Sequence, residues 1–234
     1  GAQLGIDLPG EQAGLVPTPK WKRGALDAPW HQGETLIAGI GQGSMLTTPL
    51  QMAVMTARIA NGGFAVKPHL TRAITKDGVA KSKEADKFDS LDLPLRHLEI
   101  VRAAMNDVVN SPRGTAYRSR IKEPEFAMAG KPGTVQVRRI SKAEREKGVR
   151  KNEDLPWKVR DHALFVGFAP ADNPRYAVSV VVEHGGGGSK VAAPIARDIL
   201  AEAQRRGSAG RPVKTAGQRA PADTHRTVPK ERDG

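Results

Sequence analysis

The chain lacks cysteine altogether among its 234 residues. This absence excludes a disulfide framework and any metal site built on thiolates. It is compatible with an oxidising compartment without identifying one. Long apolar runs are missing as well, because no stretch approaches the ~20 residues that a membrane-spanning helix needs, and no signal peptide opens the chain. Neither a disulfide nor a spanning helix is therefore predicted within these residues.

Aromatic and acidic residues are both scarce. Aromatics make up 4% of the chain, and Lys and Arg outnumber Asp and Glu by 37 to 25, which gives a formal charge of +12 and a pI near 10.2. Such a balance suits an anionic partner. Nucleic acid is not predicted as that partner, because the charge is accompanied by few aromatics and by no recognised nucleic-acid motif.

The basic excess is concentrated in two segments. Residues 138–160 hold nine basic and four acidic residues, and residues 207–234 hold six and three. The first segment is predicted either to grip an anionic glycan or a protein partner, or to be a solvated insertion between two strands. The second has no aromatic residue and no apolar periodicity, so a disordered tail is predicted there, separate from a domain over residues 1–206.

The sequence does contain enough apolar residues, 38% of the total, to build a core. Residues 1–43, rich in Gly and Pro, are predicted to be loop. A helix is predicted to start at Thr47 or Thr48, with Pro49 in its first turn, and to stop at Asn61-Gly62-Gly63. Two more helices are predicted from apolar spacing over residues 94–109 and 191–205.

Strands are predicted where β-branched and apolar residues alternate or run continuously. These segments are residues 64–68, 70–74, 126–137, 162–169 and 176–183. Lys76-Asp-Gly78 is predicted to be a hairpin-type turn, and residues 171–175 a tight antiparallel connection.

The strand predicted over residues 126–137 contains Lys131-Pro132-Gly133-Thr134. This tetrapeptide differs by one residue from Lys-Thr-Gly-Thr, the strand motif with which penicillin-recognising transpeptidases hold a substrate carboxylate beside a serine nucleophile. Further motifs stand in a fixed order around it: LGIDLPGE at 4–11, GIGQG at 39–43, TTPLQ at 47–51, RDHAL at 160–164, FAPADNP at 168–174 and EHGGG at 183–187.

In order and spacing these motifs resemble the second half of the transpeptidase domain of class B penicillin-binding proteins, and within that family the elongation type, penicillin-binding protein 2. The resemblance covers residues 1–206. It implies an α/β (α+β) fold, in which an antiparallel sheet is flanked by helices. It also implies acyl transfer from a D-Ala-D-Ala stem peptide to a serine and then to an amine of a neighbouring peptide, without a cofactor or metal.

The resemblance assigns roles to the tetrapeptide. Lys131 matches the motif lysine, whose ammonium raises the positive potential and hydrogen-bonds nearby hydroxyls. Gly133 would let backbone and ligand approach closely, because a Cβ there would crowd the cleft. Thr134 would donate its hydroxyl to the carboxylate, and the strand could pair with the substrate as an added strand.

Pro132 departs from the family motif at a position that normally touches the substrate. Proline supplies neither the hydroxyl nor the N–H of threonine and fixes φ near −65°. Strands accept proline mainly at edges, so we expect the fold to survive. Loss of one hydroxyl contact to a charged group costs about 1.5–3 kcal/mol, roughly ten- to a hundredfold in binding.

A nucleophile in a Ser-x-x-Lys motif is not identified in this chain. Ser119-Arg-Ile-Lys122 has the pattern, but it lies just before Lys131 and after the GIGQG segment, whereas the family order needs it well upstream on a separate helix. No Ser-x-Asn occurs, and Ser90-Leu-Asp92 is predicted to be a solvated loop. Because the chain starts at Gly1 and reads like the middle of a domain, we expect a fragment whose catalytic serine lies upstream.

Two other clusters have competing interpretations. Gly185–Lys190 is similar to a phosphate loop but fails the Walker A spacing, so a turn between strand and helix is predicted. His162 and His184 flank two predicted strands and could form a metal pair with Asp161 or Glu183. No ligand spacing supports a metal site, and histidines with satisfied hydrogen bonds are the default.

Two functions are carried forward. The first is the C-terminal part of a peptidoglycan D,D-transpeptidase that acts on stem peptides and is acylated by β-lactams. Its parent would be tethered in the inner membrane of a Gram-negative-type bacterium, with this domain in the periplasm beside membrane proteins of an elongation complex. The second is a non-catalytic remnant that binds cell-wall polymer or partner proteins.

Overall fold

The centre of the molecule is a three-stranded antiparallel sheet. A computed structural model describes residues 1–71, 73–76, 79–82, 88–138 and 140–207. The strands are β3 (Ala129–Val135), β4 (His162–Ala169) and β5 (Tyr176–Val182), in the order β3-β4-β5. Their register pairs Ala129 with Phe168 and Val135 with His162. The predicted sheet with flanking helices is confirmed.

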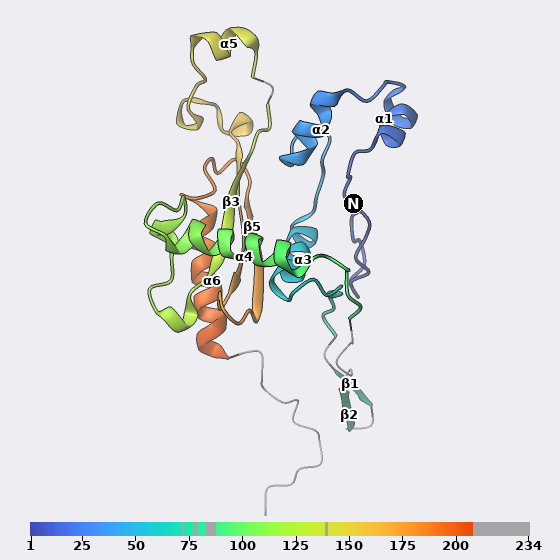
Figure 1. Cartoon of the computed structure of the whole chain (residues 1–234), viewed down its shortest axis with the longest axis vertical. Coiled ribbons are helices and arrows are strands. Elements are labelled where there is room, and N and C mark those ends of the chain that lie inside the picture. Colours follow the sequence, from blue (N-terminus) through green and yellow to red (C-terminus); the bar gives the residue numbers. More distant parts are fainter. Residues whose placement is uncertain (72, 77–78, 83–87, 139, 208–234) are drawn as a thin grey trace, which may run out of the picture.

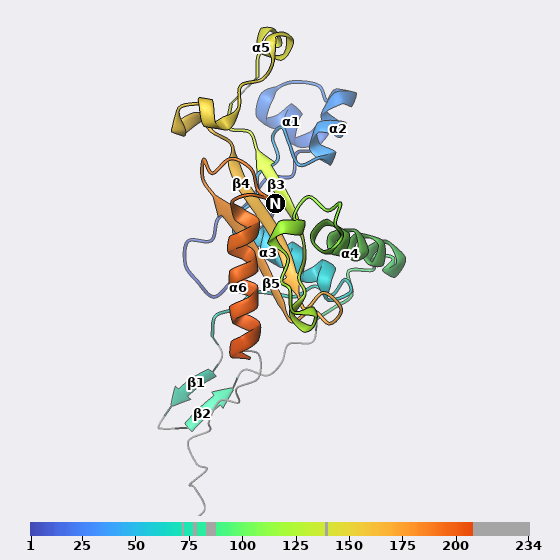
Figure 2. The same ribbon diagram turned by 90° about the vertical axis from the view of Figure 1, so that its left-hand side faces the viewer.

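Helices cover both faces of this sheet. In Figure 1, α6 (Ala192–Arg206) lies on one side of the strands and α3 (Pro49–Ala60) on the other, and α4 (Leu95–Asn110) crosses in front. Phe165 and Val180 pack with the buried alanines of α6, whereas Val166 and Phe168 pack with Ala60 of α3. The core is therefore divided by the sheet into two layers (Figure 2).

The helices start and stop where capping chemistry predicts. Thr48 accepts from the Gln51 N–H at 3.1 Å while the Gln51 side chain accepts from the Thr48 N–H at 3.0 Å, and Pro49 occupies the first turn of α3. Asn61 ends the helix. α4 follows Pro94 and α6 ends before Gly207, so all three predicted helices are confirmed within a residue or two.

The prediction of loop for residues 1–43 was wrong. Two helices form there, α1 (Pro19–Leu26) and α2 (Gln32–Gly39). Thr18 caps α1 and Pro19 begins it, the same pair of signals that begins α3. Both helices have eight residues, too few to show a clear apolar period.

Several strand boundaries also differ from the prediction. Residues 64–68 form no strand, and Phe64 makes only an isolated bridge to Ser90. The hairpin is formed instead by β1 (Ala73–Lys76) and β2 (Val79–Ser82). Residues 77–78 of the predicted turn, like the predicted tail after residue 207, lie outside the described residues. The predicted strand over 126–137 shortens to β3 because its first residue belongs to a 3-10 turn, η2 (Pro124–Phe126).

The link between β3 and β4 has structure that the sequence did not predict. It contains α5 (Lys142–Lys147) and two 3-10 turns, η3 (Asn152–Asp154) and η4 (Trp157–Val159). We call residues 136–161 the β3–β4 protrusion; α5 lies at its tip, beyond the end of the sheet in both views (Figures 1 and 2). A further 3-10 turn, η1 (Tyr117–Ser119), precedes β3.

Two carboxylates organise the start of the chain. Glu11 accepts hydrogen bonds from the main-chain N–H groups of Leu4, Gly5 and Ile6. Asp7 accepts from the N–H groups of Leu70 and Thr71 at 2.6 and 2.8 Å. The 4–11 segment therefore connects to the residues that precede β1. Within the described ranges, none of the helices is long and apolar enough to cross a membrane.

Candidate functional site

The Lys131–Thr134 tetrapeptide lies in the middle of β3, and β3 is an end strand of the described sheet. The strand starts buried, at Ala129 and Gly130, because α4 packs beside it and Asn110 of α4 donates to the Met128 carbonyl at 3.0 Å. Beyond that point the strand opens to solvent: Lys131 and Thr134 are exposed. The tetrapeptide therefore lies at the surface, on a strand whose first residues are packed in the core.

Lys131 and Gly133 lie on the α3 face of the sheet. Paired residues of neighbouring strands share a face, and Lys131 pairs with Val166, which packs with Ala60 of α3. The Lys131 ammonium donates to the Pro132 carbonyl at 2.8 Å and has no carboxylate partner in the described part of the chain. Its charge is therefore available to an anionic ligand along the strand.

Pro132 and Thr134 lie on the opposite face, which α6 covers. They pair with Phe165 and Ala163, and both of these are fully buried against α6. Pro132 is half-buried, and β3 is the end strand of the described sheet, the place where a strand tolerates a proline. An extended ligand along the outer edge of β3 would be flanked by the Lys131 ammonium from one face and by the Thr134 hydroxyl from the other.

Gly188 packs against the backbone of β3, a contact that the sequence did not reveal. A Cβ on Gly188 would lie 2.3 Å from the Gly133 carbonyl oxygen, 2.3 Å from that of Leu164 and 2.9 Å from the Gly133 nitrogen. Only glycine allows this approach. In contrast, a Cβ on the neighbouring Gly187 would meet nothing within 4 Å.

The loop that carries Gly188 is fixed by α6. The N–H groups of Ala192 and Ala193 donate to the Gly188 carbonyl at 3.0 and 2.9 Å. The predicted turn between a strand and a helix is confirmed for residues 185–190, and its glycines serve a close backbone contact. No sequence signal pairs Gly188 with Gly133, because the two are distant in the chain.

Ser119 is not placed as a nucleophile would be. Its residue is 2% exposed, and its hydroxyl faces the Ser189 carbonyl at 3.5 Å. Lys122 of the same Ser-x-x-Lys pattern is exposed and makes no contact with it. The serine therefore packs behind the sheet, on the side of α6, rather than at the β3 edge.

His162 of β4 and His184, two residues after β5, each hydrogen-bond through a ring nitrogen to a main-chain group. The His184 N–H donates to His162 Nδ1 at 2.8 Å, and His184 Nδ1 lies 3.0 Å from the Arg160 carbonyl. Trp157 packs edge-on against His184, with ring centroids 4.4 Å apart. Among the described residues, no group of three or more His, Asp or Glu side chains is arranged to hold a metal ion.

One carboxylate braces the α5 end of the β3–β4 protrusion. Arg138 makes two hydrogen bonds to Glu144, both at 2.7 Å, and Arg150 approaches the same carboxylate at 3.7 Å. Ser141 caps α5 by accepting from the Glu144 N–H. The Arg138 guanidinium lowers the pKa of Glu144 to about 2.

The comparisons with known proteins agree on one family. Residues 1–201 match the family described as "Penicillin binding protein transpeptidase domain". A relative named "Peptidoglycan D,D-transpeptidase MrdA" from Haemophilus influenzae is 37% identical over 201 residues, which are 86% of this chain and 30% of that protein. The Acinetobacter baumannii protein of the same name is 40% identical, over 83% of this chain and 28% of its own length.

Solved structures give the same result. The PBP2 chain in a complex with MreC from Helicobacter pylori matches with a TM-score of 0.71 and 32% identity, over 89% of this chain and 34% of its own. Pseudomonas aeruginosa PBP2 in complex with WCK 5153 matches with a TM-score of 0.66 and 40% identity, over 85% and 39%. The chain spans about 30% of the length of the curated relatives that it matches.

Proposed function

The chain belongs to the penicillin-binding protein transpeptidase family, and from this premise we propose that it is the C-terminal part of the catalytic domain of an elongation-type peptidoglycan D,D-transpeptidase. The domain would comprise residues 1–206, with residues 207–234 as a separate tail. The observation that carries the proposal is the open β3 strand, which presents Lys131 and Thr134 beside a free strand edge.

In this proposal the stem peptide lies along β3 as an added strand. The Lys131 ammonium attracts the terminal carboxylate and the Thr134 hydroxyl donates a hydrogen bond to it. Gly133 has no side chain to obstruct the peptide. These groups orient the D-Ala-D-Ala carbonyl for a serine that another part of the protein supplies.

The chemistry would proceed in two acyl transfers. The serine oxygen attacks the carbonyl of the penultimate D-Ala, forming an ester and releasing the terminal D-Ala as the amine leaves with a proton. The amine of a neighbouring stem peptide then attacks the ester, which forms the cross-link and returns the proton to the serine. A β-lactam acylates the same serine because its ring amide imitates the peptide.

The location and partners of the whole protein follow from the same proposal. Its relatives named MrdA come from Gram-negative bacteria, and the Helicobacter pylori PBP2 structure is a complex with MreC. We expect the whole protein to be anchored in the inner membrane, with this domain in the periplasm. There it would serve cell shape together with membrane proteins of an elongation complex.

Pro132 favours a second candidate, a non-catalytic binding protein. The position lacks the hydroxyl that the family motif provides, so carboxylate recognition would be weaker by roughly ten- to a hundredfold. A domain of this kind would keep its surfaces for cell-wall polymer and lose the chemistry.

Labelling of the full-length protein with a fluorescent penicillin separates the two candidates. We expect a covalent adduct on a serine outside residues 1–234 and labelling at least tenfold slower in Lys131→Ala. Lys122→Ala, which removes an exposed lysine just before β3, is the matched control and should label like the wild type. No adduct on the wild type would favour the non-catalytic candidate, and an adduct on Ser119 would contradict the assignment of the site to β3.

A further inference from the structure

We propose that the β3–β4 protrusion is a second binding surface, which holds an anionic glycan–peptide strand beyond the β3 edge. This inference rests on the proposed function, because it names where the polymer attached to the stem peptide would lie. Three observations carry it: the protrusion is internally braced, four of its described cations are exposed and unpaired, and it carries an exposed tryptophan connected to the motif strand.

The bracing neutralises the Glu144 carboxylate, whereas Glu146, Glu153 and Asp154 of the protrusion stay exposed. Glu144 is bound by Arg138 and lies beside Arg150, and the Glu144 side chain is only 16% exposed. A carboxylate neutralised in this way does not repel an anionic ligand. It also fixes the direction of α5, so the surface is formed before a ligand arrives.

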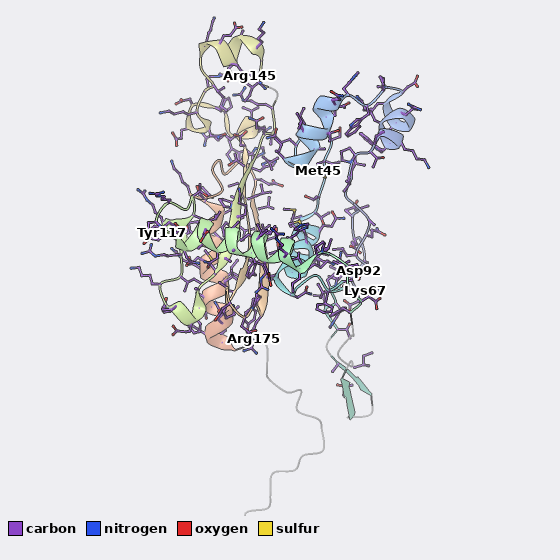
Figure 3. All side chains as sticks on the ribbon, in the orientation of Figure 1. Met45, Lys67, Asp92, Tyr117, Arg145 and Arg175 are labelled. Carbon is purple, nitrogen blue, oxygen red and sulfur yellow. The ribbon has the colours of Figure 1, made fainter. Side chains whose placement is uncertain are left out.

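Lys142 of the protrusion pairs with Glu146 and Arg160 donates to main-chain carbonyls, but four other cations point to solvent. Four exposed side chains have no hydrogen bond or ion pair within the described residues: Arg145, Lys147, Lys151 and Lys158. Figure 3 labels Arg145 on α5, beyond the end of the sheet that is opposite to Arg175 in the β4–β5 turn. Unpaired charges spread along a braced extension attract an anionic polymer over a distance of about one Debye length.

Trp157 adds a different kind of contact. Its residue is 57% exposed, yet its ring is held edge-on against His184, 4.4 Å away. The His184 N–H is bonded to His162, and His162 pairs with Val135 at the end of β3. An exposed aromatic ring is therefore connected, through His184 and His162, to the end of the motif strand.

This combination fits a polymer of sugars that carry carboxylates. The flat face of an exposed tryptophan packs on the apolar face of a sugar ring, and the separated cations match carboxylates that repeat along a chain. A membrane surface fits less well, because α5 has a charged exterior and no apolar stripe of large side chains to insert into lipid.

Binding of the full-length protein to soluble, uncross-linked peptidoglycan strands tests the proposal. The variant Arg145→Gln/Lys147→Gln/Lys151→Gln/Lys158→Gln should bind about tenfold more weakly at 100 mM salt, since four exposed ionic contacts are lost. Trp157→Ala should weaken binding about threefold. The charge-matched control Lys20→Gln/Arg113→Gln/Arg118→Gln/Lys122→Gln removes four exposed cations elsewhere and should change binding less than twofold.

Three outcomes decide the matter, with the thermal midpoint of each variant recorded to exclude unfolding. Equal binding by the protrusion variant and the control would overturn the proposal. Stronger binding to phosphatidylglycerol vesicles than to strands, lost in the same variant, would assign the surface to membrane instead. If penicillin fails to label the wild type but strand binding depends on the protrusion, the proposed function falls and the binding surface stands.

Discussion

The sheet with α6 and the β3–β4 protrusion are built by opposite means. Phe165, Val180 and Leu200 hold the first region together by apolar burial, and α6 approaches closely because it presents alanines. The protrusion is held mainly by hydrogen bonds and charges, around Glu144 and between Asn152 and Asp161. Apolar packing is nearly indifferent to pH and salt, whereas ion pairs at a surface respond to both.

β3 joins the two regions, and this decides how the candidate site is held. Its first residues, Ala129 and Gly130, are part of the packed core, whereas Val135 leads out into the protrusion. The tetrapeptide lies between the packed end of β3 and the end that leads into the protrusion, whose conformation depends on ion pairs. A disturbance of the core should therefore affect fold and site together, and a disturbance of the protrusion should affect the site's surroundings alone.

The largest effect should follow from a cavity in the core. Phe165 is fully buried beneath α6, so Phe165→Ala should lower the free energy of unfolding of this domain by about 3–5 kcal/mol. Chemical denaturation of the full-length protein measures it. Phe64→Ala removes the same side chain from a site that is 48% exposed and should cost under ~1 kcal/mol. Equal losses would show that the sheet does not depend on the α6 layer.

A smaller effect, confined to the site, should come from Gly188→Ala. The new methyl group must displace the backbone of Gly133 or Leu164. Misplacement of a reacting group by about 1 Å costs up to about a hundredfold in rate, so penicillin acylation should slow by roughly ten- to a hundredfold with a small change in unfolding free energy. Gly187→Ala, in open space, should leave acylation unchanged. Similar rates in the two variants would show that Gly188 does not position β3.

Restoring the threonine of the family motif should make acylation faster instead of slower. Pro132→Thr supplies a hydroxyl beside the strand edge, so acylation of the full-length protein should become about tenfold faster. Stopped-flow measurement with a chromogenic cephalosporin reports the rate. An unchanged rate would mean that carboxylate recognition here does not use that hydroxyl.

The smallest effect should be local to the protrusion. Glu144→Gln should raise amide hydrogen exchange in residues 142–150 about two- to fivefold at pH 7, without a change in β4. Because the pKa of Glu144 is lowered to about 2, its ion pairs persist above the ordinary value near 4.5 and weaken as pH falls toward 2. Wild-type protection in this segment, taken relative to the intrinsic exchange rate at each pH, should fall in that acid window only. Protection that is constant from pH 7 to pH 2 would contradict the ionic account.

The sequence predicted the long elements and missed the short helices and the contacts between distant segments. Thr18-Pro19 and Thr48-Pro49 both begin helices, but only the second is followed by a run long enough to show a buried face. β4 and β5 were found because both faces of the sheet are covered and their residues are nearly all apolar.

In the candidate site, too, the residues of a local motif were predicted and a residue that depends on a distant contact was not. Lys131, Gly133 and Thr134 were selected by a resemblance, and their roles stay predictions. Gly188 could not be found, because its necessity comes from a backbone distant in the chain. The 4–11 segment was identified only as a motif, and the structure supplies its physical reason in the hydrogen bonds of Asp7 and Glu11.

The hydrogen bonds of Asp7 have a mechanical consequence. The Thr71 hydroxyl and the N–H groups of Leu70 and Thr71 hold the pKa of Asp7 well below its usual range, and the Leu4 N–H does the same, less strongly, for Glu11. In a chain without a single disulfide, Asp7 acts as a non-covalent clasp that closes residues 8–69 into a loop containing α1, α2 and α3, and Glu11 fixes the backbone of residues 4–6 just before it. A force or ligand that moves the 4–11 segment therefore also pulls on the β1–β2 hairpin, and strong acid, by protonating Asp7, would release the two ends at once.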